Sequence, residues 1–525
     1  MTRPRKNRFP LLLFCYFLVV VHPVAASSAE SQDEDVRAAL EAFSRVYQVA
    51  EANYADPLDP DAAILDGAIR GLLSRLDPFS AFFDPEQYRQ LQDQQQGRAR
   101  GFGSILYVQS GKLLVLQTLE GSPSWRAGLG PGDEIVKIND KRVDLLPLPD
   151  LVQLLRQART SRVRLGVVRP GKILPEEFIL DPAEINPPSV DKAFLLSPGV
   201  AYLHLRGFDR RTPQEVAQSL RDLGDSSMKG LILDLRGNRG GGLDSGVRVA
   251  GLFLPGGKTV VTMRGRSIPE KEFSTPVPNP YYTFPLVVMT NGETASAAEI
   301  VAGALQDQDR AVVVGESSFG KAAVQSVMPL SEGMGIALTT AAYFTPSGRS
   351  IQRPLKSSGG ELLDFSMVNG GAMANAGAVA NGGADDLSFR SLGGRPLPGG
   401  GGIIPDLLAQ GWQLTLWTRF LERNTVFVNF AQFYLTIRGS VKEEFEVTDA
   451  VMEQFNDYLR NVGILVPADA WKSDQQFLRM RIKNELFNLV FGLEKGDEVE
   501  VRNDPQVLKA QEVLPRVEEI LRPPS

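Results

Sequence analysis

The sequence predicts an α/β core that follows a strand-rich module and is flanked by helical segments. In residues 190–354, short apolar strands alternate with helical runs, which indicates an α/β layer fold with at least partly parallel strands. Residues 97–185 contain short strands separated by turns. Residues 30–96 and 407–525 carry amphipathic helical patterns without chemical motifs, so we expect them to serve packing or dimer contacts.

The N-terminus has the pattern of a secretory signal. A basic stretch, MTRPRKNR, precedes an apolar run from Phe9 to Val21 and a small-residue cleavage pattern at residues 24–26. The run has 13 residues, whereas a helix needs about 20 to span a bilayer. We therefore expect residues 1–26 to be removed and the protein to be exported to a periplasmic or other extracytoplasmic compartment of the bacterial type. Membrane association is expected only if the signal stays uncleaved.

The composition restricts the chemistry that the exported chain can perform. Removing the four basic residues of the signal from 56 leaves 52 against 62 acidic residues, a net charge of −10, which disfavours nucleic acid as a partner. The single cysteine, Cys15, and His22 also lie in the signal. His204 has no evident acid–base partner nearby in sequence, so we expect it to be packed. No disulfide, metal site or cofactor is expected, and lysine is the most plausible base for a nucleophile.

Ser296 is the first candidate for chemistry, because it follows NGETA and begins the helix-forming run AAEIVAGAL. A serine at this position can simply be a helix N-cap. The same position suits a nucleophile, since the helix dipole and the free N–H groups favour negative charge on the oxygen. In that case the Ala297 amide would be an oxyanion donor.

Lys321 follows 25 residues later, after an apolar strand and among small neighbours. Such surroundings would desolvate the amine and lower its pKa, as a lysine base requires. If residues 321–325 form a strand, Gln325 projects from the same face and would orient the amine. The alternative is an exposed lysine in a loop.

Three other motifs are weaker candidates. Residues 315–321 match the phosphate-loop pattern G-x-x-x-x-G-K, but Ala322 replaces the required Ser or Thr and a strand, not a helix, is expected to follow. Two S-x-x-K matches, at Ser189 and Ser226, lack the motifs that accompany penicillin-type acyl transfer. We therefore predict neither nucleotide binding nor that reaction.

A glycine run supplies a second element of a hydrolytic site. Gly240, Gly241 and Gly242 lie within DLRGNRGGGLD, directly after an apolar strand. Consecutive glycines let the backbone approach a substrate closely and can present a second oxyanion N–H group. The alternative is a strand-to-helix turn that needs positive φ angles, and both interpretations can hold together.

The strand-rich module resembles a PDZ domain. Its segment GSPSWRAGLGPGDEIVKINDKRV has a short helix followed by GL-x-PGD-x-I-x-x-I-N. The residues Gly101, Phe102, Gly103 and Ser104 resemble the PDZ carboxylate loop. Amides of such a glycine-rich turn bind a terminal carboxylate, and the strand that follows pairs with an extended peptide.

Taken in order along the chain, the motifs resemble those of the carboxyl-terminal processing (tail-specific) serine proteases. They are YADPLDPDAAILDGAIRGLLSRLDPFSAFF, the PDZ segment, DLRGNRGGG, TASAAEIVAGALQD, VGESSFGKAAVQ, YFTPSGRSIQ and GIIPD. The resemblance implies an α/β protease core with a crotonase-like ββα pattern, an inserted PDZ domain and flanking helical segments. It also implies that Ser296 is the nucleophile, Lys321 the general base and Gln325 the orienting residue. Ala297 and one glycine of 240–242 would form the oxyanion hole.

The implied function is an exported serine endopeptidase that recognises C-terminal tails of unfolded proteins and needs neither metal nor cofactor. The sequence does not decide whether the protein forms a homo-oligomer or works with an adaptor protein. The alternative is a catalytically inactive PDZ scaffold on a protease-like core. Two residues depart from the family pattern, because Ala322 replaces a usual glycine and Arg239 a usual proline.

The resulting domain prediction has six parts. They are a signal peptide (1–26), an N-terminal helical region (27–96), a PDZ domain (97–187), a protease core (188–354 and 403–415), a Gly/Ala-rich insert expected to be a mobile loop (355–402) and a C-terminal helical region (416–525).

Overall fold

The computed structural model describes residues 27–522 apart from 354–388 and short gaps at 96–98, 110, 120, 160, 170–171, 173, 186 and 400. The expected signal peptide and most of the Gly/Ala-rich insert therefore lie outside the described residues. The chain divides into two compact units, Met1–Arg75 and Leu76–Ser525.

The first unit is helical, as its apolar periodicity predicts. It contains α1 (Ser27–Asn53), the π-helix η1 (Asp61–Ile69) and α2 (Arg70–Ser74). Along α1 the apolar side chains of Val36, Leu40 and Phe43 are exposed. No helix of the described residues is long and apolar enough to cross a membrane.

The second unit begins with a short strand and helix and continues into the strand-rich module. The first two elements are β1 (Ala81–Phe83) and α3 (Pro85–Gln95). The module is an antiparallel sheet of β3 (Ser104–Gln109), β4 (Lys112–Thr118), β5 (Glu134–Ile138), β7 (Val163–Val168) and β8 (Glu176–Leu180), in that order, with β6 (Lys141–Arg142) on β5. Its helices are α4 (Pro123–Arg126), η2 (Val143–Leu145) and α5 (Leu148–Ala158). The strands β2 (Ala99–Gly101) and β9 (Ala183–Ile185) pair where the chain enters and leaves the module.

A six-stranded sheet forms the centre of the second unit, which confirms the predicted α/β layering. Its order is β10 (Val190–Ser197), β11 (Val200–Leu205), β12 (Gly230–Asp234), β15 (Leu286–Thr290), β16 (Val312–Gly315) and β21 (Leu407–Leu408). Only the β10–β11 pair is antiparallel. The central strands are largely apolar because both faces of this largely parallel sheet are covered.

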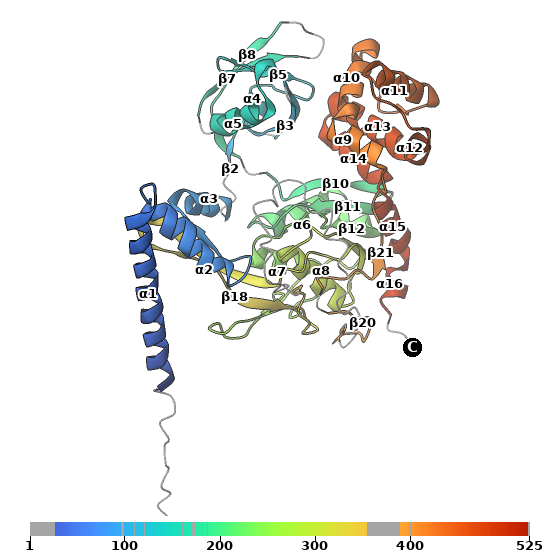
Figure 1. Cartoon of the computed structure of the whole chain (residues 1–525). Helices are drawn as coiled ribbons and strands as arrows, with labels where there is room; N and C mark the ends of the chain where they lie inside the picture. Colours follow the sequence, from blue (N-terminus) through green and yellow to red (C-terminus); the bar gives the residue numbers. More distant parts are fainter. Residues whose placement is uncertain are drawn as a thin grey trace, which may run out of the picture. The chain divides into compact units, whose positions relative to one another are not determined.

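The two faces of this sheet are covered by helices from different parts of the chain (Figure 1). One face carries Leu231 and Leu233, which join a core with α6 (Thr212–Asp222), α7 (Leu243–Gly251) and α8 (Ala297–Asp307). The opposite face carries Ile232, which joins a core with α15 (Pro505–Val513), η7 (Leu514–Arg516) and α16 (Val517–Ile520). Short 3-10 turns are η3 (Asp225–Ser227) and η4 (Ser331–Gly333). The C-terminal helices are thus an integral layer of the core.

A second sheet lies beside this core. It contains β1, β18 (Gly335–Phe344), β13 (Thr259–Arg264) and β14 (Lys271–Ser274), and β17 (Ala323–Pro329) pairs with β18. The pairing of β1 with β18 joins a segment that precedes the strand-rich module to one that follows it.

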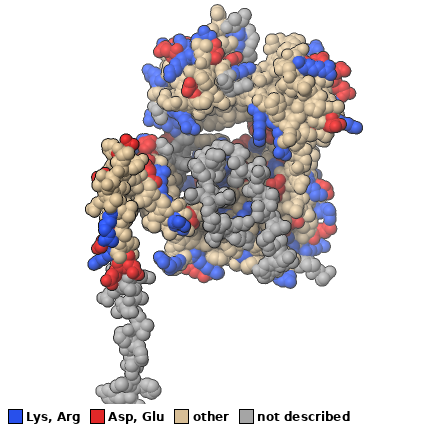
Figure 2. Space-filling model, in the orientation of Figure 1, with Lys and Arg blue, Asp and Glu red and all other residues tan. Residues whose placement is uncertain are grey.

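The remaining C-terminal helices surround an aromatic core. They are α9 (Leu416–Arg423), α10 (Val426–Arg438), α11 (Asp449–Asn461), α12 (Ala468–Ser473), α13 (Gln475–Phe491) and α14 (Leu493–Asn503). Phe427, Phe430 and Phe455 are fully buried there. On the face drawn in Figure 2, acidic and basic side chains are interspersed over the described residues.

The described end of the Gly/Ala-rich insert is packed, which corrects the prediction of a mobile loop for this part. The short strands β19 (Phe389–Arg390) and β20 (Pro396–Leu397) form a hairpin. Between them Arg395 is buried and forms ion pairs with Asp309 at 2.7 Å and Asp406 at 2.6 Å. These ion pairs hold the segment in place. The glycine-rich composition of the insert gave no indication of them.

Candidate active site

Ser296 lies at a sharp turn between β15 and α8. Its backbone has φ 57° and ψ −118°, a region that non-glycine residues rarely adopt and that stores strain. Two hydrogen bonds fix the turn to the segment that follows β12: Thr294 Oγ1 donates to the Leu235 carbonyl and the Ala295 amide donates to the Asn238 carbonyl, each at 2.9 Å. The helix begins at Ala297, directly after the serine. The local fold therefore presents a half-buried hydroxyl at the N-terminal end of a buried helix.

Lys321 ends the loop that follows β16, and Gln325 lies in β17. The ammonium or amine nitrogen Nζ donates to Gln325 Oε1 at 2.9 Å. The structure therefore brings these two predicted residues together. Among the described residues, no hydrogen bond joins Lys321 to the Ser296 hydroxyl. In this resting arrangement the amine is held by the glutamine.

A buried carboxylate that the sequence analysis did not single out connects the serine to the lysine loop. Glu299 is fully buried in the first turn of α8. Its Oε2 accepts from the amides of Ser296 and Lys321, each at 2.9 Å. Its Oε1 accepts from Ser318 Oγ at 2.5 Å and from the Gly320 amide at 2.7 Å. Burial raises the pKa of Glu299, and these four donors oppose that rise. A single side chain thus fixes the backbone of both candidate catalytic residues.

The surroundings of Lys321 favour its neutral form. Burial lowers the pKa of the Lys321 amine, while the carboxylates of Asp77 and Glu299 act in the opposite direction. The Phe79 ring lies 4.8 Å from Nζ, measured to the ring centroid. A lowered pKa extends to lower pH the range in which the amine is neutral, and only the neutral amine can accept a proton.

The glycine run passes directly over the serine. A Cβ atom on Gly240, whose φ is +93°, would lie 2.7 Å from Ser296 Cβ and 2.9 Å from the Ala297 nitrogen. The Gly240 amide donates to Asn238 Oδ1 and the Gly242 amide to the Phe208 carbonyl, each at 2.9 Å.

Among the described residues, the amides of Gly241 and Ala297 have no acceptor. Of the four predicted oxyanion donors, the amides of Gly240 and Gly242 are thus already bonded within the turn.

An arginine anchors the start of the glycine turn. Arg236 donates hydrogen bonds to Asp234, which is 1% exposed. Burial raises the pKa of Asp234, but its partners, chiefly Arg236, together outweigh this effect and the pKa is lowered. The other nitrogen of Arg236, Nη1, donates to Asp504 Oδ2 at 2.7 Å and to Gln506 Oε1 at 2.6 Å. Because Asp504 caps α15, the C-terminal layer contacts the turn that carries the glycines.

The four residues predicted to bind a terminal carboxylate run from the last residue of β2 to the first residue of β3. The Phe102 carbonyl accepts from the Ser124 amide at 3.0 Å, and the Gly103 carbonyl accepts from the Leu119 amide at 2.8 Å. Ser104 Oγ donates to Ser124 Oγ at 2.6 Å. β3 is an edge strand, and α5 packs beside it. An edge strand beside a helix is the arrangement to which an extended peptide can add.

Comparison with known proteins agrees with this architecture. The model of peptidase family S41 matches residues 199–356, and a PDZ domain model matches residues 114–169. The carboxy-terminal-processing protease of Bartonella bacilliformis is 31% identical over 333 residues, which are 63% of this chain and 76% of that protein. The chain belongs to the carboxyl-terminal processing protease family.

Two further relatives support the same assignment. The carboxyl-terminal-processing protease of Synechocystis is 37% identical, covering 54% of this chain and 68% of its own length. The carboxy-terminal processing protease CtpB of Bacillus subtilis is 31% identical, covering 63% of this chain and 68% of its own length. The protein is therefore a peptidase with a PDZ domain, and the predicted fold class is confirmed.

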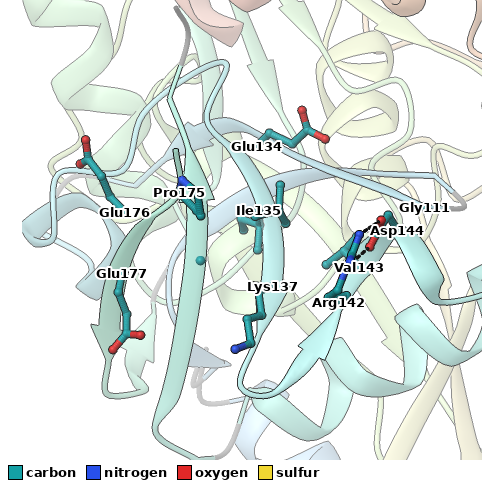
Figure 3. A pocket seen from close by; sticks show the side chains of 12 residues that line it. Gly111, Glu134, Ile135, Lys137, Arg142, Val143, Asp144, Pro175, Glu176 and Glu177 are labelled. Atoms are coloured by element: carbon teal, nitrogen blue, oxygen red, sulfur yellow. Dashed lines mark hydrogen bonds and ion pairs between the residues drawn. The ribbon is translucent and has the colours of Figure 1, made fainter. Parts of the chain in front are cut away.

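A cavity of about 580 Å³ lies on the PDZ domain of this processing protease (Figure 3). It is lined by β5 and by the residues around β6 and the start of β8, including Glu134, Lys137 and Glu176. None of the four predicted carboxylate-loop residues lines it. The cavity is therefore separate from the predicted peptide site.

The weaker sequence candidates have structural partners that account for them. Residues 315–321 lead from one strand to another, β17, so the helix that a phosphate loop requires is missing at this place. Ser189 Oγ bonds to Thr212 Oγ1, whereas Lys192 pairs with Asp497. Among the described residues no cluster of His, Cys, Asp and Glu could hold a metal ion.

His204 is packed, as expected, but it does have an acidic partner. Its Nδ1 lies 2.5 Å from Asp191 Oδ1, and its Nε2 lies 3.0 Å from the Arg236 carbonyl. These partners raise the pKa of His204, although burial opposes them. Asp191 lies 13 positions before His204 in the sequence, and the irregularity of the β10–β11 pair between Val190 and Lys192 brings it to the imidazole.

Proposed function

We propose that this processing protease is an exported serine endopeptidase that hydrolyses peptide bonds with Ser296 as nucleophile and Lys321 as general base. The observation that carries the proposal is the shared attachment of both residues to Glu299. Glu299 thereby fixes the relative position of a strained serine at a helix N-terminus and a lysine with a lowered pKa.

The first half of the reaction follows from these positions. Neutral Lys321, with one N–H still donated to Gln325, accepts the proton of Ser296 Oγ with its lone pair, and the serine oxygen attacks the scissile carbonyl carbon. Negative charge on the carbonyl oxygen is stabilised by the amides of Ala297 and Gly241. The protonated Lys321 then gives its proton to the leaving amine, and an acyl-enzyme on Ser296 remains.

Hydrolysis of the acyl-enzyme reverses the proton path. Lys321, again neutral, accepts a proton from a water molecule that attacks the ester carbon. The same proton returns to Ser296 Oγ as the carboxylic acid product leaves. Gln325 supports both halves by accepting a hydrogen bond from the amine.

Substrate recognition is assigned to the PDZ domain. We propose that the C-terminal tail of an unfolded protein adds to the edge strand β3, with its carboxylate at residues Gly101–Ser104. The carbonyls of Phe102 and Gly103 are already bonded within the domain, which fixes the path of this loop. The basic and apolar N-terminal pattern of residues 1–26 supports export, including to a periplasm.

Cleavage of a fluorescein-labelled unfolded casein tests the proposal. The wild-type protein is expected to release peptides, whereas Ser296→Ala and Lys321→Ala are expected to lose this activity with unchanged melting temperatures. Full activity of Lys321→Ala would exclude it as the base. A wild-type protein that binds tail peptides but never cleaves them would instead favour the alternative of a non-catalytic PDZ scaffold.

A further inference from the structure

Residues 76–83, which precede the PDZ domain, contact the proposed catalytic base. The matched S41 segment begins only at residue 199, yet the Phe79 ring lies 4.8 Å from Lys321 Nζ. In addition, Gln325 Nε2 donates a hydrogen bond to the Phe79 carbonyl oxygen. Both the proposed base and its orienting residue are therefore touched by one residue that lies more than 200 positions earlier.

We propose that Phe79 is a positioning residue for the peptidase reaction, whose ring covers the Lys321 amine and whose carbonyl fixes the amide of Gln325. This inference rests on the proposed Ser–Lys function. It assigns to the segment before the PDZ domain a part in the active site.

The segment is held rigidly in place. Asp77 Oδ1 accepts from the amides of Phe79 and Ser80 at 2.7 and 2.8 Å, and Asp77 Oδ2 accepts from Ser80 Oγ at 2.9 Å. The buried Ser80 accepts from the Thr339 amide at 3.3 Å, and β1 then pairs with β18. Since β18 also pairs with β17, which carries Gln325, the position of Phe79 is set by the same sheet as its target.

The carbonyl contact decides which way the Gln325 amide points. A carbonyl oxygen can only accept, so the NH₂ group of Gln325 must face Phe79 and the Oε1 atom must face Lys321. Oε1 then accepts one N–H of the amine. The lone pair of neutral Lys321 stays free for the proton of the serine. With the amide reversed, the NH₂ group would compete for that lone pair.

The ring contact controls the hydration of the amine. The Phe79 face attracts an ammonium ion, but its cover also excludes water, which disfavours charge. The acidic groups that act on Lys321 are Asp77, beside the ring, and Glu299, on α8. Both favour the ammonium form. Because burial is the largest influence on the lysine, we expect removal of the ring to raise the pH at which the base becomes active.

The test compares the pH dependence of kcat/KM for labelled unfolded casein among variants of the full protein. Phe79→Ala is expected to lower kcat about tenfold or more, with KM little changed. The midpoint of its pH profile should move upward by about one pH unit. Phe79→Leu restores an apolar cover and is expected to keep the wild-type midpoint.

Two further variants keep the experiment decisive. Phe83→Ala changes another half-buried phenylalanine of the same segment and should keep the wild-type profile. If Phe79→Ala does not fold, Phe79→Gln fills the space with a hydrated group and should show the same upward shift. Wild-type kcat and midpoint in a folded Phe79→Ala or Phe79→Gln would overturn the inference. Failure of the proposed function is distinct, because Ser296→Ala would then match the wild-type protein.

Discussion

Replacing Glu299 with glutamine is predicted to damage both stability and catalysis. The substitution keeps the shape of the side chain but turns one of its two oxygens into an NH₂ group. Each oxygen accepts two hydrogen bonds: those to Oε2 are both 2.9 Å long, and those to Oε1 are 2.5 and 2.7 Å long. If the NH₂ group replaces Oε2, the amides of Ser296 and Lys321 lose their acceptor inside a fully buried site. If it replaces Oε1, the Gly320 amide loses its acceptor, and the Ser318 hydroxyl must accept instead of donate.

The magnitude follows from these four contacts. Hydrogen bonds to a charged group contribute about 1.5–3 kcal/mol each, so the loss of one or two predicts about 1.5–6 kcal/mol of destabilisation. At about 2 °C per kcal/mol for a large domain, the melting temperature should fall by roughly 3–12 °C. Since Glu299 sets the spacing of Ser296 and Lys321, a shift of about 1 Å predicts a loss in kcat of about 100-fold.

The assay combines thermal unfolding with casein cleavage well below the melting temperature. Glu293→Gln is the matched control, because Glu293 lies on the same turn, is 41% exposed and has only a 3.4 Å ion pair with Arg239. Exposed pairs contribute about 0–1 kcal/mol, so the control should resemble the wild-type protein. A Glu299→Gln protein with wild-type kcat and melting temperature would refute the reasoning.

Three other predictions follow from the same geometry. Because Lys321 must be neutral to act and burial lowers its pKa, kcat/KM should rise with pH to a plateau. The midpoint of the rise should lie below the pKa of an ordinary lysine, about 10.4; a profile that falls above pH 7 would contradict this. Gly240→Ala places a Cβ 2.7 Å from that of the nucleophile and should reduce kcat about 100-fold, whereas Gly292→Ala, where nothing lies within 4 Å, should be neutral in the same assay. Arg236→Gln leaves the buried Asp234 without its cation, so denaturant unfolding should show a loss of about 3–5 kcal/mol.

The candidate residues were named from their local setting. Ser296 precedes a strong helix former. Lys321 and Gln325 are in contact as predicted, but not through a strand over 321–325, because β17 begins only at Ala323 and is irregular between Val324 and Gln325. Glu299 also left a local signal, since S-A-A-E has the spacing of a capping box. Its bonds to Gly320 and Lys321 could not be predicted, because they depend on how the next loop folds back onto α8.

Long-range contacts account for what the sequence did not reveal. The ion pair of Arg236 with Asp504 joins residues 268 positions apart, and the contact between Phe79 and Gln325 spans 246. Amphipathic periodicity predicted the C-terminal helices but not that α15 covers the second face of the central sheet. The choice among Gly240, Gly241 and Gly242 likewise required the backbone, because only hydrogen bonding shows which amide is available.

A crystal structure with a peptide boronate bound would test the assignment of Ser296 and Lys321. We expect a covalent bond from Ser296 Oγ to boron, with Lys321 Nζ within about 3.2 Å of that oxygen. One boronate hydroxyl should accept from the amides of Ala297 and Gly241. Attachment to another residue, or a Lys321 amine that stays on Gln325 and out of hydrogen-bond reach of Ser296, would contradict the proposed Ser–Lys mechanism.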